Sequence, residues 1–151
     1  MSLTTPIRGG CACGAIRYEC SEQPLFTWLC HCEDCRKATG SAYAVNVFFT
    51  PSAMTFTGSE PKSYTTTGLS GEALNHLFCS TCGSPVGALA DAFPIMRSVR
   101  ASSLDDPTGL KPMANLWNSS ALPWDRLDPD LLQFETQPTE EEFGKIMASL
   151  G

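Results

Sequence analysis

The chain has 151 residues, a formal net charge of −6 at neutral pH and a pI of about 4.8. This acidity argues against a nucleic-acid partner, because a basic face is needed to displace counterions from phosphates. No apolar run approaches the ~18 residues of a membrane span, so no membrane association is expected. The first residues lack the charged and apolar segments of a signal peptide. We therefore expect a cytoplasmic globular protein.

Short strands separated by glycine and proline dominate the pattern, which indicates a mainly β fold. Alternating or β-branched and aromatic segments predict strands over residues 15–20, 25–29, 42–49, 54–57, 62–66, 73–78, 85–89, 95–101 and, as the last strand, 113–117. A short helical turn is expected over residues 36–39, ending at Gly40.

A different pattern appears at the C-terminus. Thr139 and Glu142 have the spacing of a capping box, and apolar residues follow at helical spacing from Phe143 to Leu150. We expect an amphipathic helix over residues 139–150 that packs against the sheet. No linker or repeat is visible, so we expect a single domain over residues 1–151, with its core at about 7–134.

Eight cysteines in a chain without a signal peptide favour metal binding over disulfides. Two pairs share a glycine after the second cysteine, in Cys11-Ala12-Cys13-Gly14 and Cys79-Ser80-Thr81-Cys82-Gly83. A tight knuckle around a metal-bound sulfur often needs a positive φ there, and glycine adopts it at little cost. The two pairs predict a closed, structural zinc site with four sulfur ligands.

Cys30, Cys32 and Cys35 form a third group within six residues. Three protein ligands leave one position of a tetrahedral zinc ion open, which is the arrangement of catalytic sites. A thiol in that position would be deprotonated. The group therefore predicts a second, catalytic zinc that activates a small-molecule thiol such as glutathione.

The other candidate ligands leave an alternative open. Cys20 has no neighbouring ligand and is expected to be a small buried side chain. The ring of His31 should point away from the flanking sulfurs if the segment is extended, and His76 is expected to be structural. The fold could still bring Cys20 or His76 to the third group and close it. Arg36 and Lys37 are either contacts for an anionic ligand or solvated surface charges.

Three segments, at residues 10–14, 30–41 and 78–84, resemble the glutathione-dependent formaldehyde-activating enzyme family, which includes centromere protein V. The resemblance extends over about residues 7–134. It implies an Mss4-like fold of curved antiparallel sheets, with a structural zinc on Cys11, Cys13, Cys79 and Cys82 and a catalytic zinc on Cys30, Cys32 and Cys35. It also implies condensation of glutathione with formaldehyde to S-hydroxymethylglutathione, a carbon–sulfur lyase activity.

Two positions depart from the family pattern. Asn115 stands where the family often has histidine, and Ala121 where it often has lysine. If those groups contact substrate, another thiol or aldehyde is used here, and activity with formaldehyde itself should be weak. Two functions follow: a zinc enzyme that adds a thiol to a small aldehyde, or a non-catalytic zinc module that binds a protein partner. An open coordination position is needed only by the enzyme.

Overall fold

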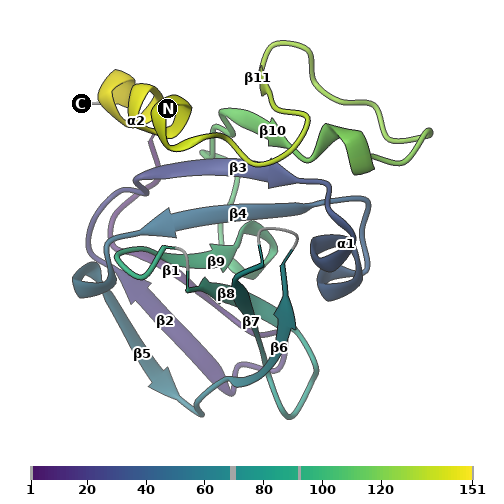
Figure 1. Cartoon of the computed structure of the whole chain (residues 1–151). Coiled ribbons are helices and arrows are strands. Elements are labelled where there is room, and N and C mark those ends of the chain that lie inside the picture. The colour runs from purple at the N-terminus through teal and green to yellow at the C-terminus, as the bar shows by residue number, and fades with distance from the viewer. Residues whose placement is uncertain (1, 69–70, 92, 151) are drawn as a thin grey trace.

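The computed structural model describes residues 2–68, 71–91 and 93–150, which form two β-sheets and two α-helices (Figure 1). The smaller sheet has the order β1 (Ile7–Gly10), β2 (Ile16–Cys20), β5 (Met54–Gly58). The larger sheet has the order β11 (Leu132–Gln133), β10 (Ala114–Leu116), β3 (Phe26–Cys30), β4 (Ala44–Phe49), β9 (Arg97–Arg100), β8 (Pro85–Ala90), β7 (Ala73–Phe78), β6 (Lys62–Thr67). The mainly β prediction is confirmed.

Two features of the larger sheet differ from the prediction. β10 runs parallel to both β3 and β11, whereas the other strand pairs of the described residues are antiparallel. The prediction that the last strand lies at residues 113–117 is wrong, because β11 follows it. A strand of two residues is too short to show an alternating pattern, so sequence periodicity could not reveal it.

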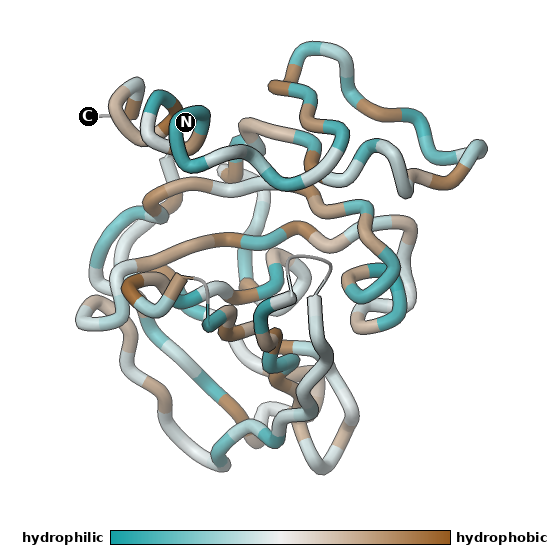
Figure 2. The backbone as a smooth tube through the Cα atoms, in the orientation of Figure 1, coloured by the Kyte–Doolittle hydropathy of each residue, from teal (hydrophilic) through white to brown (hydrophobic). Residues whose placement is uncertain are grey.

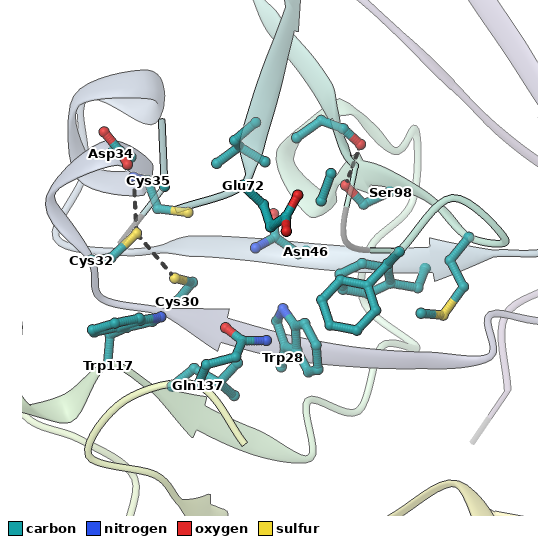
Figure 3. Close-up of a pocket in the computed structure, with 18 of the residues that line it drawn as sticks. Trp28, Cys30, Cys32, Asp34, Cys35, Asn46, Glu72, Ser98, Trp117 and Gln137 are labelled. Carbon is teal, nitrogen blue, oxygen red and sulfur yellow. Dashed lines mark hydrogen bonds between the residues drawn. The ribbon is translucent and has the colours of Figure 1, made fainter. Parts of the chain in front are cut away.

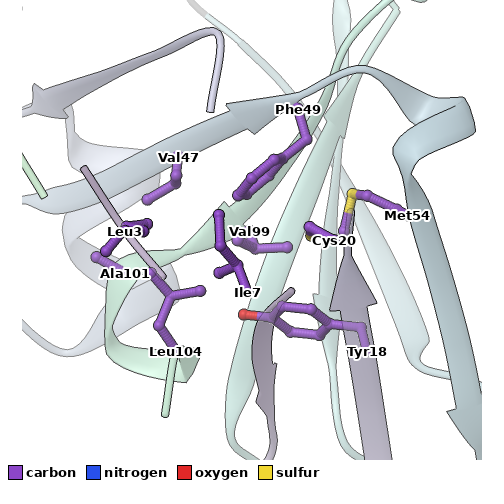
Figure 4. Close-up of a cluster of buried hydrophobic side chains, with 10 residues drawn as sticks. All are labelled: Leu3, Ile7, Tyr18, Cys20, Val47, Phe49, Met54, Val99, Ala101 and Leu104. Atoms are coloured by element: carbon purple, nitrogen blue, oxygen red, sulfur yellow. The ribbon is translucent and has the colours of Figure 1, made fainter. Parts of the chain in front are cut away.

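One face of the larger sheet packs against the smaller sheet. Side chains from both sheets form this core, shown in Figure 4: Leu3, Ile7, Tyr18, Cys20, Val47, Phe49, Met54, Val99, Ala101 and Leu104. Val47 pairs directly with Val99 across β4 and β9. Because side chains alternate between the faces of a strand, the neighbours of these residues point to the opposite face.

That opposite face carries aromatic side chains and several polar ones. Trp28 on β3 pairs with Asn46 on β4, and Asn46 pairs with Arg100 on β9. Phe48 pairs in the same way with Ser98. Figure 2 shows hydrophobic residues along β3 and β4. The face is therefore apolar, with a few polar side chains placed by the register.

Helix α1 (Glu33–Thr39) follows β3 directly. The Sγ of Cys32 caps it by accepting a hydrogen bond from the backbone N–H of Cys35 at 3.4 Å. The helix ends at Gly40, whose φ of 66° is left-handed. The predicted stop at Gly40 is confirmed, and the helix begins earlier than residue 36 because a thiol serves as its cap.

Helix α2 (Glu140–Leu150) confirms the C-terminal prediction. The backbone N–H of Thr139 donates to Glu142 at 2.8 Å, and that of Glu142 donates to the Thr139 hydroxyl at 3.2 Å, which is a capping box. The ring of Phe143 packs edge-on against Phe26 at 5.6 Å. The helix therefore covers the outer end of the face that carries Trp28. Among the described residues, no helix is long and apolar enough to cross a membrane.

Candidate active site

The first cysteine cluster joins the two sheets. Cys11 and Cys13 lie between β1 and β2, while Cys79 and Cys82 lie between β7 and β8, and the four sulfurs are within 4.8 Å of one another. The Sγ atoms of Cys11 and Cys13 are 3.6 Å apart, and those of Cys13 and Cys79 are 3.8 Å apart. Zinc–sulfur bonds of ~2.3 Å at tetrahedral angles require sulfurs about 3.8 Å apart. The cluster therefore has the dimensions of a four-sulfur zinc site.

Each half of this cluster is a tight turn. Gly14 and Gly83 have φ values of 79° and 76°, as the sequence predicts. The N–H of Gly14 donates to the carbonyl of Cys11, and that of Gly83 to the carbonyl of Cys79. The N–H of Ile16 donates to the Sγ of Cys11 at 3.2 Å. Such N–H donors stabilise negative charge on sulfur.

Ser84 ties the two turns together. Its hydroxyl accepts from the N–H of Ala12 at 3.0 Å and lies 3.1 Å from the Sγ of Cys82. Hydrogen bonds from the hydroxyl and backbone of Ser84 lower the pKa of Cys82 to about 5. A thiol that is ionised at neutral pH is ready to bind a metal ion.

The second cluster lies where β3 passes into α1. Cys30 is the last residue of the strand, Cys32 caps the helix, and Cys35 lies in its first turn. All three are buried, and their sulfurs lie within 4.8 Å of one another, with Cys30 and Cys32 3.3 Å apart. Hydrogen bonds from Cys30 and Cys32, and then the charge of Arg100, hold the pKa of Cys35 well below its usual value.

In the part of the chain that the structure describes, no further Cys, His, Asp or Glu comes close enough to complete this cluster. Cys20 lies in the core between the sheets (Figure 4). The ring of His31 is directed to Asp125 at 2.7 Å and Asn115 at 3.1 Å. The alternative in which Cys20 or His76 closes the cluster is therefore not what the structure shows.

A chain of polar side chains runs from β7 to β4 beside the second cluster. His76 is buried, which lowers its pKa, and its Nδ1 lies 3.5 Å from an Arg100 guanidinium nitrogen. Arg100 donates a short hydrogen bond to the Oδ1 of Asn46. Arg100 is only 2% exposed, its Nε has no partner, and the ion pairs of the described residues do not include it. A buried guanidinium thus lies close to the cysteines.

A pocket of about 190 Å³ opens beside the second cluster (Figure 3). Its lining is mostly aromatic and aliphatic: Trp28, Cys30, Cys32, Asp34, Cys35, Asn46, Phe48, Gly68, Glu72, Ala73, Leu74, Ala88, Ala90, Phe93, Met96, Ser98, Arg100, Leu116, Trp117 and Gln137. The three cysteines lie at one side of it, and Trp28 and Ser98 lie further along (Figure 3). The pocket therefore extends from the sulfurs over the apolar face of the larger sheet.

The orientation of the Asn46 amide is fixed. Its oxygen accepts from Arg100, which can only donate, so the amide nitrogen must point the other way. Figure 3 shows this nitrogen directed toward the side of the pocket where the cysteines lie. The Asn46 amide thus offers a neutral N–H donor near the sulfurs, with its direction fixed by Arg100.

Trp117 borders the second cluster, with its ring packed against the cysteines. Its φ of 60° is left-handed, which is uncommon for a bulky residue. The following N–H groups are held by the carbonyls of residues 134–135, so the surrounding loop imposes this conformation. Strained backbone of this kind is typical of binding and catalytic sites.

Four residues that the sequence offers as possible ligand contacts do not line the pocket. Arg36 donates to the carbonyls of His31 and Ser120, and Lys37 forms an exposed ion pair with Glu33, so neither faces the pocket. Asn115 and Ala121 are also outside the pocket lining. Sequence reasoning did not single out four residues that line the pocket beside the second cluster, Trp28, Asn46, Arg100 and Trp117. For Asn46 and Arg100 the only signal was a polar residue within a predicted strand, and for the two tryptophans there was none.

Residues 6–120 match the sequence pattern of the family described as glutathione-dependent formaldehyde-activating enzyme. The chain belongs to this family. A crystal structure of a Rhodobacter sphaeroides protein, a structural-genomics target, is similar in fold, with a TM-score of 0.53 and 19% identity over 84% of this chain and 98% of that one. A comparison with curated proteins gives no match. Family membership agrees with the resemblance that the cysteine motifs indicate.

Proposed function

We propose that this protein is a zinc-dependent enzyme that adds a low-molecular-weight thiol such as glutathione to a small aldehyde, a carbon–sulfur lyase-type activity. The observation that carries the proposal is the second cysteine cluster: three sulfurs, no fourth ligand among the described residues, and a pocket beside them. A module that only binds a protein partner needs neither the open position nor the pocket. Family membership supports the same reaction.

The donor sets fit the metal that the reaction requires. Soft thiolate ligands favour zinc, with Cys11, Cys13, Cys79 and Cys82 suited to a structural ion and Cys30, Cys32 and Cys35 to a catalytic one. When bound at the second cluster, zinc supplies a Lewis acid with an open position that holds a thiol as its thiolate. We therefore expect two ions per chain with different roles.

Asn46 is suited to stabilise the charge that develops in the reaction. As the thiolate sulfur bonds to the carbonyl carbon, the π electrons move to the oxygen, which then takes a proton from solvent. A preorganised N–H donor near that oxygen lowers the barrier, and loss of one such donor typically costs about 10²–10³ in rate. The Nδ2 of Asn46 is the pocket donor whose direction is fixed by another residue, since Arg100 holds its oxygen.

The pocket walls favour the reaction by holding the two reactants together and by excluding water. Trp117 packs against the cysteines, and Trp28 and Phe48 line the apolar part of the pocket beyond them. Apolar walls strengthen the hydrogen bond from Asn46, because electrostatic interactions are stronger where water is absent. Holding both reactants in this pocket also removes much of the entropic cost of their encounter.

Exchange NMR spectroscopy on an aldehyde, glutathione and their adduct tests this proposal. The spontaneous addition is appreciable, so the exchange rate must be measured rather than the yield. We expect the zinc-loaded protein to raise the rate in proportion to its concentration. Cys32→Ser should abolish the increase, whereas Cys20→Ala, a change outside both clusters, should retain it.

The outcome decides between two classes of function. A rate that the zinc-loaded protein does not change, across several thiols and aldehydes, would reject the enzyme and favour the non-catalytic module. The proposed reaction uses metabolites of the cell interior, which is consistent with the predicted cytoplasmic location. Measurement of bound zinc with and without glutathione adds an independent check. Binding of the thiol at the second cluster should change the amount of zinc held there and leave the zinc of the first cluster unchanged.

A further inference from the structure

The size and apolar lining of the pocket indicate that the aldehyde substrate is larger than formaldehyde. A cavity of 150 Å³ lined by aliphatic and aromatic side chains binds benzene, which has six non-hydrogen atoms. At the same volume per atom, the pocket of about 190 Å³ has room for about seven or eight non-hydrogen atoms. Formaldehyde has two and would leave most of the apolar surface in contact with water.

The apolar part of the pocket lies beyond the cysteines. Trp28 and Phe48 pack ring against ring at 4.8 Å and form part of the sheet face. Ala88 pairs with Ser98, which pairs with Phe48, and the small side chains of Ala88 and Ala90 line the pocket further along the sheet. Phe93 and Met96 complete the lining at this end. A flat or branched hydrocarbon group fits this surface by hydrophobic burial.

The charges of the lining do not suit the peptide part of glutathione. Asp34 and Glu72 contribute carboxyl groups, and Arg100 contributes a guanidinium that is buried and bonded to Asn46. Among the described lining residues, no exposed cation is available for the two carboxylates of glutathione. With its sulfur at the cysteines, the thiol must therefore keep its charged ends in solvent, which leaves the apolar pocket to the other reactant.

We propose that the aldehyde used by this enzyme carries an aromatic or aliphatic group of about five to six non-hydrogen atoms besides its carbonyl carbon and oxygen, and that this group occupies the space lined by Trp28, Phe48 and Ala88. This inference rests on the proposed function, because it assigns the second reactant of the same site. It makes the enzyme selective for aldehydes such as benzaldehyde or heptanal, and it predicts weak activity with formaldehyde without any role for Asn115 or Ala121.

The test measures glutathione exchange by NMR with acetaldehyde, butanal, hexanal, heptanal and benzaldehyde, each divided by its uncatalysed rate. Burial of each methylene should raise this ratio by about threefold to fourfold until the pocket is full. Ala88→Leu and Ala90→Leu fill the space and should remove the preference for long aldehydes, so that the ratios for hexanal, heptanal and benzaldehyde fall to about the ratio for acetaldehyde. Ala148→Leu adds the same side-chain group on the exposed side of α2 and should change nothing.

A second measurement does not depend on turnover. Benzyl alcohol, which cannot react, should alter the tryptophan fluorescence of the native protein, because Trp28 and Trp117 line the pocket, and Ala88→Leu should weaken this binding by at least about tenfold. Equal acceleration of short and long aldehydes, or a preference that follows the apolar character of the thiol instead, would overturn the inference while leaving the proposed function intact. Binding of benzyl alcohol without acceleration of any aldehyde would reject the proposed function, and the substrate assignment with it.

Discussion

The Nδ1 of His31 lies 2.7 Å from the Oδ2 of Asp125, and both side chains are almost fully buried. This contact connects the segment between two site cysteines with the loop that follows β10. Asn115 lies 3.1 Å from the other ring nitrogen. Asn115, one of the two positions at which this chain departs from the family pattern, is therefore buried in a polar network behind the cysteines and does not line the pocket.

Asp125→Ala should destabilise the fold because it leaves a buried imidazole nitrogen without its partner. We expect a loss of about 1–3 kcal/mol in the free energy of unfolding, measured by urea denaturation at a fixed zinc concentration. Asp130→Ala, a change at an exposed carboxylate in the same loop, should stay within about 0.5 kcal/mol of the parent. Equal stability of the two variants would show that the contact is not stabilising.

Cys82→Ser tests the first cluster. A structural zinc contributes its binding energy to folding, and the four sulfurs connect the two sheets. We expect this variant to lose cooperative thermal unfolding and much of its solubility. A soluble Cys82→Ser protein with the parental melting temperature would remove the structural role of the cluster.

Cys32→Ser should behave differently, because the first cluster remains intact. The fold should persist, seen as an unchanged far-ultraviolet circular dichroism spectrum, while bound zinc falls by up to one ion per chain. Atomic absorption after reconstitution with zinc measures this directly. A zinc content equal to that of the parent, after reconstitution of both proteins, would argue against a metal at the second cluster.

The cysteine clusters were accessible from the sequence because their ligands lie in short local motifs. The spacing of Cys11 and Cys13, and the glycine after each knuckle, determine the local turn. The same applies to the stop at Gly40 and the capping box at Thr139, which depend on neighbours within one helical turn. These features required no knowledge of the sheet.

The pocket residues were not accessible in this way. Asn46 and Arg100 are far apart in sequence, and only the register between β4 and β9 places them opposite each other. β10 pairs in parallel with β11 over two residues and with β3 over three, which leaves no periodic signal. The chemistry of the cysteines was therefore predictable, whereas the groups that would act on the second reactant depend on long-range pairing.

Arg100→Met should weaken the metal site selectively. The guanidinium is a buried positive group close to the three cysteines, and loss of a group that supports metal ligands typically lowers affinity by about 10–100-fold. Methionine has a similar length but cannot donate a hydrogen bond, so the buried Asn46 oxygen loses its partner and the variant should lose about 1–3 kcal/mol of stability. Zinc affinity is therefore compared under conditions in which circular dichroism shows both proteins to be folded. Competition with a chromophoric chelator should show weaker binding of one ion, with the four-cysteine site as internal control. Arg97→Met, on the same strand but the other face, should bind both ions as the parent does.

Asn46→Ala separates chemistry from metal binding. Asn46 is not a ligand of either cluster, so both ions should remain, while loss of the N–H donor should lower the rate of thiol addition by about 10²-fold or more.

Asn46→Asp provides the sharper comparison. It keeps the size of the side chain and can still accept from Arg100, but it places negative charge where the reacting oxygen gains its own, so its rate should be no higher than that of Asn46→Ala. Zinc analysis alongside exchange NMR measures both properties. An Asn46→Ala protein with full zinc content and the parental rate would remove Asn46 from the mechanism, and the developing charge would then have to be stabilised elsewhere in the pocket.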